Sequence, residues 1–225
     1  MLFLVLGKGK TGSLVTQVAR AHGHGVRVLD FAENHHASAL TGPLLAGVDV
    51  VIDFTTADAA LENMRAVLAL GGRIVVGTTG WYAQLPEMRA LAVKRGGALL
   101  YGTNFSIGVQ KLFSLTAELA KLEGYQFSIA ETHHESKLDA PSGTAITLKQ
   151  IIEAERPGET VEVISHRAGD AKGEHIVTAS GPDDVLELRH DALSRRGFAL
   201  GAVRAAEWLA DKSGPHEFRE IFDRL

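Results

Sequence analysis

The stretch Glu131–Ala145 carries the side chains of this sequence that could do acid–base chemistry together. It contains two adjacent histidines, His133 and His134, then Lys137, and ends in a Pro-Ser-Gly-Thr turn. Histidine titrates near neutral pH and can give or take a proton, while a lysine ammonium can protonate a substrate or hold a carboxylate. We therefore interpret the stretch as a site that binds an anion and protonates a group attached to it.

Two periodic segments must position this stretch. An apolar alternation predicts a strand over Tyr125–Ala130, which would deliver the histidines to a loop, and helical spacing predicts a helix over Thr144–Ala154. The N-terminus of such a helix offers unpaired backbone N–H groups and the positive end of the helix dipole, which suit a carboxylate or phosphate.

Composition limits the possible functions. The chain has 225 residues, a net charge of −4 and no cysteine. The charge argues against general nucleic-acid binding, and the absence of cysteine excludes disulfides, thiolate nucleophiles and cysteine-bound metals. Met1–Leu6 is too short for a signal peptide, and no apolar run reaches the length of a membrane span. We expect a cytoplasmic protein without nucleic-acid or membrane partners.

A second candidate site begins at the N-terminus. An apolar strand over Leu2–Leu6 runs into a Gly-x-Gly-x-x-Gly turn, which is followed by a helical pattern and by a second strand over Val26–Asp30. This order predicts a dinucleotide-binding turn, with the Asp30 carboxylate on the adenosine ribose hydroxyls. The alternative is a glycine-rich turn that serves only packing. The turn residues are Gly7, Lys8, Gly9, Lys10, Thr11 and Gly12.

The residue after the acid bears on the choice of nucleotide. Phe31 follows Asp30, so no adjacent arginine can bind a 2′-phosphate, and NADH is favoured over NADPH. Lys8, Lys10 or His35 could still compensate. His35 and His36 themselves are expected in a solvated loop.

Apolar strands and helices alternate through the rest of the first half and predict a parallel, doubly wound α/β sheet. Ligands of such sheets lie beyond the carboxyl ends of the strands. Polar or glycine-rich loops occur there at 7–12, 30, 53–55, 77–80 and 102–105. From Ser106 the order changes to helix, strand, helix, strand and a hairpin, which predicts a smaller α+β domain with one mixed sheet. We expect residues 1–105, completed by C-terminal helices over 198–225, to bind the dinucleotide. Residues 106–197 are expected to bind substrate and to form oligomer contacts.

The two sites together suggest hydride transfer coupled to proton donation. Adjacent residues on an extended chain face opposite ways, so His133 and His134 are expected to have different roles. Each histidine alone is typical of a partly buried structural ring, but Lys137 and the helix start favour a functional site. A metal centre made of His133, His134 and Glu135 is not expected, because consecutive residues do not converge easily on one ion. Asp139 is expected to form a turn or cap rather than to act as a base.

The stretch Glu-x-His-His-x-x-Lys-x-Asp-Ala-Pro-Ser-Gly-Thr-Ala at 131–145 resembles the signature of the 4-hydroxy-tetrahydrodipicolinate reductase (dihydrodipicolinate reductase) family. The resemblance covers nearly the whole chain. It includes segments at 53–55, 77–80, 104–109, 167–169, 173–175 and 201–205. The chain is shorter than is usual for the family, and the loss lies mainly in 33–47.

The resemblance implies a Rossmann-type domain, a smaller substrate domain and an NADH- or NADPH-dependent reductase of lysine and diaminopimelate biosynthesis. His133 would be the proton donor or acceptor and Lys137 a second acid. His134, Ser142, Gly143 and Thr144 would bind a small dicarboxylate substrate. Phe54 and Thr55 would bind the cofactor, and its nicotinamide end would contact Gly77, Thr78, Thr79, Gly102, Thr103, Asn104 and Phe105.

The resemblance further implies a homotetramer assembled through the sheets of the substrate domain. Two other interpretations stay open. One is a related dehydrogenase acting on another amino-acid-derived imine. The other is a non-catalytic NAD-binding sensor, which would be expected to lack the proton donors.

Overall fold

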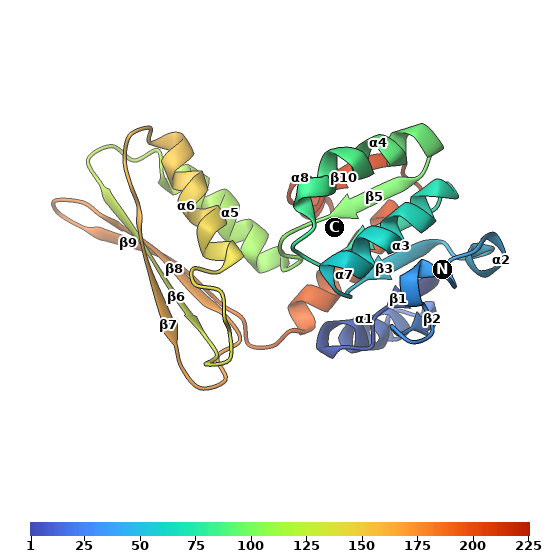
Figure 1. Ribbon diagram of the computed structural model, residues 1–225. Coiled ribbons are helices and arrows are strands. Elements are labelled where there is room, and N and C mark those ends of the chain that lie inside the picture. Colours follow the sequence, from blue (N-terminus) through green and yellow to red (C-terminus); the bar gives the residue numbers. More distant parts are fainter. The chain divides into compact units, whose positions relative to one another are not determined.

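The computed structural model describes residues 1–225, which form two compact units. The first unit contains residues 1–106 and 196–225, and the second contains residues 107–195. The first unit is therefore assembled from both ends of the chain, as the colours in Figure 1 show. None of the helices combines the length and the apolar character needed to span a lipid bilayer.

The first unit is built around a six-stranded sheet in which every paired strand runs parallel to its neighbour. The strand order is β10-β5-β4-β3-β1-β2. Strands β3 and β5 are buried along their whole length, because helices cover both faces of a parallel sheet. The predicted doubly wound fold is confirmed. The strands are β1 (Leu2–Leu6), β2 (Gly25–Leu29), β3 (Val50–Asp53), β4 (Arg73–Val76), β5 (Ala98–Tyr101) and β10 (Gly214–Glu217).

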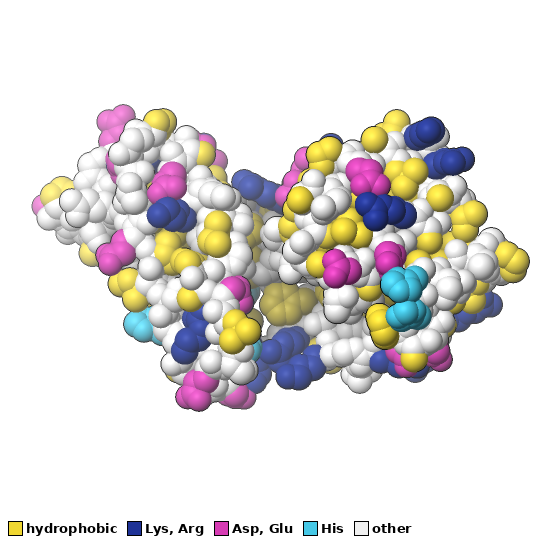
Figure 2. All heavy atoms as spheres, viewed as in Figure 1, with side chains coloured by type: hydrophobic (Ala, Val, Ile, Leu, Met, Phe, Trp, Pro, Cys, Tyr) yellow, Lys and Arg dark blue, Asp and Glu magenta, His cyan; other side chains and the backbone are white.

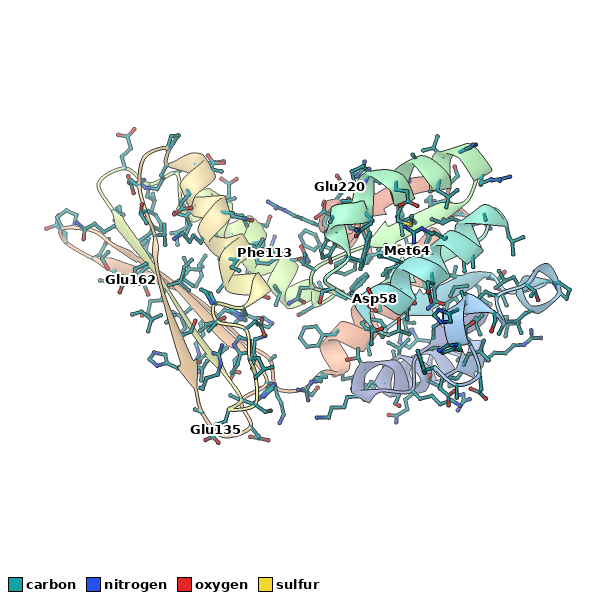
Figure 3. All side chains as sticks on the ribbon, viewed as in Figure 1. Asp58, Met64, Phe113, Glu135, Glu162 and Glu220 are labelled. Atoms are coloured by element: carbon teal, nitrogen blue, oxygen red, sulfur yellow. The ribbon has the colours of Figure 1, made fainter.

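Four longer helices cover this sheet. Helices α3 (Ala57–Ala69) and α4 (Leu85–Arg95) lie over one face, and Met64 points from α3 into their shared core (Figure 3). Helices α1 (Lys10–Ala21) and α7 (Arg196–Leu209) pack against each other over the opposite face. Short turns complete the unit: η1 (His35–Ala37), α2 (Gly42–Leu45), η2 (Tyr82–Gln84), α8 (Phe218–Ile221) and η3 (Phe222–Arg224).

The second unit is a four-stranded mixed sheet in the order β7-β6-β8-β9. Strands β6 and β7 run parallel, while β8 is antiparallel to both β6 and β9. Helices α5 (Ile107–Leu119) and α6 (Gly143–Glu155) contribute with β6 and β8 to one apolar core, which includes Phe113 (Figure 3). The strands are β6 (Gln126–His133), β7 (Glu162–Arg167), β8 (Glu174–Ser180) and β9 (Val185–Asp191).

The structure differs from the sequence expectations at three elements. The expected strand end at Ala130 is wrong, because β6 continues to His133 through pairing with β7 and β8. The solvated loop expected around His35 and His36 contains the short helices η1 and α2. The C-terminal segment is not wholly helical, because β10 joins the sheet beside β5. The predicted hairpin of β8 and β9 is confirmed.

Candidate active site

The glycine turn of the first unit is shaped by two close approaches. Gly7 has a φ of 99°, and a Cβ atom there would lie 2.4 Å from the Phe54 carbonyl oxygen. A Cβ atom at Gly12 would lie 2.1 Å from the Gly7 carbonyl oxygen. Gly9 meets nothing within 4 Å and faces open space. The first and third glycines therefore close the turn, while the second leaves room for a ligand.

Lys8 of this turn forms an ion cluster with two carboxylates that follow β2. Lys8 Nζ lies 3.1 Å from Asp30 Oδ2 and 2.8 Å from Glu33 Oε2. Asp30 Oδ1 accepts a hydrogen bond from Glu33 N at 3.0 Å, and Glu33 Oε2 accepts one from Asp30 N at 2.9 Å. These hydrogen bonds, from the Glu33 backbone first and then from Lys8, lower the pKa of the Asp30 carboxyl. Two carboxylates thus share one cation at the edge of the turn.

A cavity of about 390 Å³ lies between this cluster and the end of β3. The glycine turn and Asp30 line one side of it, and Phe54 and Thr55 line the other. Its volume lies in the range of small-molecule sites. The structure therefore brings Gly7, Lys8, Gly9, Asp30, Phe54 and Thr55 together, as the sequence predicted.

A buried carboxylate fixes the loops beyond β3 and β4. Asp53 accepts hydrogen bonds from the side chains of Asn63 (2.7 Å), Thr55 (2.8 Å) and Thr78 (2.8 Å). Burial raises the pKa of the Asp53 carboxyl, and these hydrogen bonds oppose that shift. Thr78 Oγ1 also accepts a hydrogen bond from Thr55 N at 2.8 Å. The Thr78 hydroxyl is thus occupied inside the protein and holds the two loops together.

A second cavity of about 240 Å³ lies on the other side of Phe54. A Cβ atom at Gly77 would come within 2.2 Å of the Phe54 ring, so a side chain there would displace that ring. Gly102 packs against α8, since a Cβ atom there would lie 2.8 Å from Phe218 Cβ. Lys10 and Thr79 are exposed and line neither cavity. The second cavity is lined by Thr11, Phe54, Gly77, Thr103, Asn104, Phe105 and Phe198.

In the second unit, His133 ends strand β6 with only 8% of its surface exposed. Its ring lies 5.1 Å from the ring of His175 on β8, at an interplanar angle of 75°. Burial lowers the pKa of the His133 imidazole to about 4, and the nearby Glu131 carboxylate opposes that shift. The His133 ring is therefore neutral at pH 7 in the unliganded protein.

Glu131 is the centre of this cluster and was not predicted as a site residue. Ser142 N donates to both of its carboxylate oxygens, at 3.0 and 3.2 Å, and Ser165 Oγ donates to Oε1 at 2.7 Å. The His175 imidazole, 3.6 Å from Oε2, and the hydrogen bonds from Ser142 and Ser165 keep the pKa of the Glu131 carboxyl far below its usual range despite burial. Glu131, on β6, thus connects the start of α6 with β7.

The sequence of β6 could have indicated this cluster, because its buried and less buried residues alternate. Phe127, Ile129, Glu131 and His133 all lie on the buried face of the strand. An acid that continues an apolar alternation must find buried partners, because an unpaired charge in the core is costly. On β8, His175 continues the buried face of Val177 and Ala179 in the same way.

The loop after β6 carries the remaining predicted residues. Lys137 Nζ lies 2.7 Å from both carboxylate oxygens of Asp139. His134 is half-buried, and its Nδ1 lies 2.8 Å from Ser136 Oγ. Glu135 lies at the exposed tip of the loop (Figure 3). The loop therefore separates His133, on the sheet, from Lys137 and His134 next to solvent.

Helix α6 begins at Gly143, with Ser142 as its N-cap. Ser142 Oγ accepts a hydrogen bond from Ala145 N at 3.2 Å and lies 3.2 Å from His175 Nε2. The Ser142 side chain is therefore used inside the protein. Gly143 is exposed, and a Cβ atom there would meet nothing within 4 Å. The open backbone at the positive end of α6 suits an anion.

Two clusters bring two histidines and an acid together. His22, His24 and Glu207 lie near the protein surface, where both imidazoles contact Glu207 Oε1. In the buried cluster, Glu131 already accepts protein hydrogen bonds, and Arg167 lies 3.7 Å from its Oε1, so a divalent ion would sit beside an existing cation. We assign that cluster to hydrogen bonding.

His35 and His36 are exposed, and Figure 2 shows histidine side chains gathered on the surface of the first unit.

Comparison with known proteins assigns the family. The profile for "Dihydrodipicolinate reductase, N-terminus" matches residues 1–105, and that for "Dihydrodipicolinate reductase, C-terminus" matches residues 108–223. The chain belongs to the dihydrodipicolinate reductase family.

Curated members of this family match over most of their length. The 4-hydroxy-tetrahydrodipicolinate reductase of Christiangramia forsetii is 35% identical, and the alignment covers 100% of this chain and 99% of the relative. The corresponding reductase of Natronomonas pharaonis is 38% identical, with 94% and 96% covered.

Solved structures support the fold. The dipicolinate-bound dihydrodipicolinate reductase of Paenisporosarcina sp. TG-14 superposes with a TM-score of 0.80 at 24% identity, covering 100% of this chain and 99% of that one. The aspartate dehydrogenase of Thermotoga maritima shares the fold more distantly, with a TM-score of 0.55, 14% identity and coverages of 94% and 97%.

Proposed function

We propose that this chain reduces 4-hydroxy-tetrahydrodipicolinate to tetrahydrodipicolinate with a nicotinamide cofactor, in lysine and diaminopimelate biosynthesis. The observation that carries this proposal is a set of acid–base and anion-binding groups in the second unit. The chain that contains them matches the family over both of its halves. There, a buried imidazole, a lysine ammonium and an open helix N-terminus belong to one continuous segment, 131–145. These are the groups that protonation of a bound dicarboxylate requires.

We place the cofactor in the first unit, where the protein provides room for its polar parts. The open backbone at Gly9 and the N-terminus of α1 suit a pyrophosphate, since a helix N-terminus attracts anions. Asp30 lies at the other end of the larger cavity and can accept hydrogen bonds from ribose hydroxyls. Phe105 and Gly77 line the second cavity, which suits a flat ring. The bound cofactor would supply the hydride.

NADH is the nucleotide that this geometry favours. Lys8 is held by both Asp30 and Glu33, so one positive and two negative charges lie together beside the cavity. A 2′-phosphate would meet this net negative charge, whereas ribose hydroxyls can donate to Asp30. The preference depends on Lys8 remaining engaged with the two carboxylates.

The second unit would bind the substrate and deliver the proton. The two carboxylates of the substrate fit the positive end of α6, at Gly143 and Thr144, and the cations next to it. Lys137 would exchange its contact with Asp139 for a substrate carboxylate or serve as a second acid. His133 is neutral in the free protein, and a dianion beside it would raise its pKa and charge it. His134 would bind substrate at the rim.

We also propose a homotetramer assembled through the sheet of the second unit. Strands β7 and β9 carry exposed apolar side chains, with Ile164 44% and Val185 59% exposed. Burial of such residues against other copies would be favourable, because apolar surface removed from water stabilises an assembly. Light scattering or sedimentation of the purified chain tests this proposal, and a monomer at micromolar concentration would contradict it.

The reductase activity is tested by coupling the purified chain to the synthase that makes its substrate. NADH oxidation should depend on the synthase and should be more efficient than NADPH oxidation. His133→Gln should lower kcat much more than it changes KM, whereas His134→Gln should mainly raise KM. Absence of synthase-dependent oxidation with either nucleotide would refute the activity. Equal effects of the two variants on kcat would refute the division between His133 and His134.

A further inference from the structure

Glu131 is a charged side chain in a fully covered position. Its side chain has 0% exposure, and it lies on the sheet between His133 on the same strand and His175 on the neighbouring strand. A carboxylate is retained in such a place only if its partners compensate for the lost hydration. The arrangement of those partners around its two oxygens indicates what Glu131 does.

The two oxygens have different surroundings. Oε1 accepts short hydrogen bonds from Ser165 Oγ and Ser142 N, and Arg167 lies 3.7 Å away. Oε2 accepts only the longer of the two hydrogen bonds that Ser142 N donates, at 3.2 Å. It faces His133 Nδ1 and His175 Nε2, each at 3.6 Å. Oε1 therefore anchors the carboxylate, and Oε2 is directed at the imidazoles.

The two nitrogens of His133 are also differently placed. Nδ1 is buried and makes no hydrogen bond, although Glu131 Oε2 is 3.6 Å away. Nε2 faces the backbone at Gly173, where a Cβ atom would lie 3.1 Å from it. A carboxylate behind one ring nitrogen fixes the tautomer and the orientation of the ring, and hydrogen bonds of this kind often shorten when substrate binds.

We propose that Glu131 is a positioning residue for His133: it accepts a hydrogen bond from Nδ1–H, so that Nε2 is the nitrogen that exchanges a proton with the substrate. This inference rests on the proposed function, in which His133 is the proton donor. Closing the 3.6 Å gap takes a shift of about 0.7 Å, to the usual hydrogen-bond length. The charge that forms on the ring would then be balanced by a carboxylate that Ser142 and Ser165 hold through Oε1.

His175 and Glu131 are expected to shift the pKa of His133 in opposite directions. Its Nε2 faces the same Oε2 and also lies 3.2 Å from Ser142 Oγ, so the two imidazoles compete for one oxygen. The charged or titratable groups acting on His133 are Glu131, which favours its protonation, and His175, Lys137 and Arg167, which oppose it. Removal of Glu131 should lower the pKa of His133, and removal of His175 should raise it.

The test uses the full-length enzyme and three variants. Glu131→Gln keeps the size but removes the charge, and its one amide oxygen would accept from Ser142 N and Ser165 Oγ, so that an amide N–H group faces His133. We expect kcat to fall about ten- to a hundredfold, as for loss of one charge-assisted hydrogen bond. KM should change by less than about threefold, because the variant leaves the proposed substrate contacts in place. Ser165→Ala is the comparison variant, since it removes one hydrogen bond to Glu131 and leaves the charge. Its kcat should fall less than that of Glu131→Gln, because a carboxylate still faces His133 Nδ1.

The direct readout is the state of the His133 ring, followed by ¹⁵N-resolved NMR without any turnover. At pH 7 the wild type should hold its proton on Nδ1, and Glu131→Gln should shift it toward Nε2. His175→Gln should keep the Nδ1 tautomer and raise the pKa of His133. If Glu131→Gln fails to fold, the tautomer of the wild type decides the inference alone, and a His133 proton on Nε2 at pH 7 would overturn it.

Three further results would overturn the inference. One is an unchanged His133 tautomer in Glu131→Gln, and another is a Ser165→Ala effect on kcat as large as that of Glu131→Gln. The third is one equivalent of zinc in the purified wild type that His175→Gln loses, since the cluster would then be a metal centre. None of these results bears on synthase-dependent NADH oxidation by the wild type, whose absence would refute the proposed function instead.

Discussion

Helix α7 and the loop after β5 approach each other at Gly201 more closely than any side chain would allow. A Cβ atom at Gly201 would lie 1.8 Å from the Phe105 carbonyl oxygen and 3.2 Å from Phe218 Cζ. Gly201→Ala must therefore push α7 and the loop apart by about 1.2 Å or more to reach even a tight contact. Because Phe105 lines the second cavity, this shift should disturb both packing and nucleotide binding.

The size of the effect follows from the cost of overpacking. Such insertions cost about 1–3 kcal/mol, and occasionally more when backbone must move. For a chain of this length, each kcal/mol lowers the melting temperature by about 2–4 °C, so we expect a loss of about 2–12 °C. The dissociation constant for NADH should rise as well, because part of the cavity wall is displaced.

Gly197→Ala on the same helix is the matched control, because a Cβ atom there meets nothing within 4 Å. Its melting temperature should stay unchanged or rise slightly, since alanine favours the helix over glycine. Thermal unfolding followed by circular dichroism, with NADH binding followed by fluorescence, measures both effects. Equal melting temperatures for the two variants, or an unchanged NADH affinity in Gly201→Ala, would contradict the packing argument.

Three further predictions concern the two sites. Asp30→Ala should raise KM for NADH and lower KM for NADPH, because Lys8 is then less neutralised; steady-state kinetics with both nucleotides measure the change, and an unaltered ratio would contradict it. Dipicolinate, the ligand in the Paenisporosarcina structure, tests the proposed dicarboxylate site. Its binding at pH 6 should take up as much as about one proton, because the His133 imidazole has a pKa of about 4 in the free protein and a dianion beside it would raise that pKa. Calorimetry in buffers of different ionisation enthalpy measures this uptake, which His133→Gln should abolish. Gly173→Ala should lower kcat without weakening NADH binding, because Gly173 has a φ of 137° and its Cβ would press on His133 Nε2; a wild-type kcat would rule out that contact.

Most of the first unit could be predicted because its signals are local. The apolar strands, the glycine turn and Asp30 each occupy a short segment, and parallel β-α order then determines the edge of the sheet at which they meet. Strand β10 could not be found in this way. Its sequence, Gly214-Pro215-His216-Glu217, has no apolar alternation, and proline is tolerated because the strand lies at the sheet edge.

The cluster around Glu131 could be predicted only in part. His133 is marked by its neighbours in the sequence, but Ser165 and His175 lie more than thirty residues away and reach Glu131 only through strand pairing. The end of β6 depends on the same pairing, since Thr132 and His133 lie opposite residues of β7. Such contacts are nonlocal, and periodicity along one segment does not reveal them.

The position of β10 affects the synthesis of the chain. Strand β5 lies inside the completed sheet, but its partner β10 leaves the ribosome more than a hundred residues later, after the whole second unit. At usual rates of translation the edge of β5 stays unpaired for roughly ten seconds. An unpaired strand edge can associate with other chains. The nascent enzyme should therefore be most prone to aggregate, and most in need of a chaperone, while its second unit is being made.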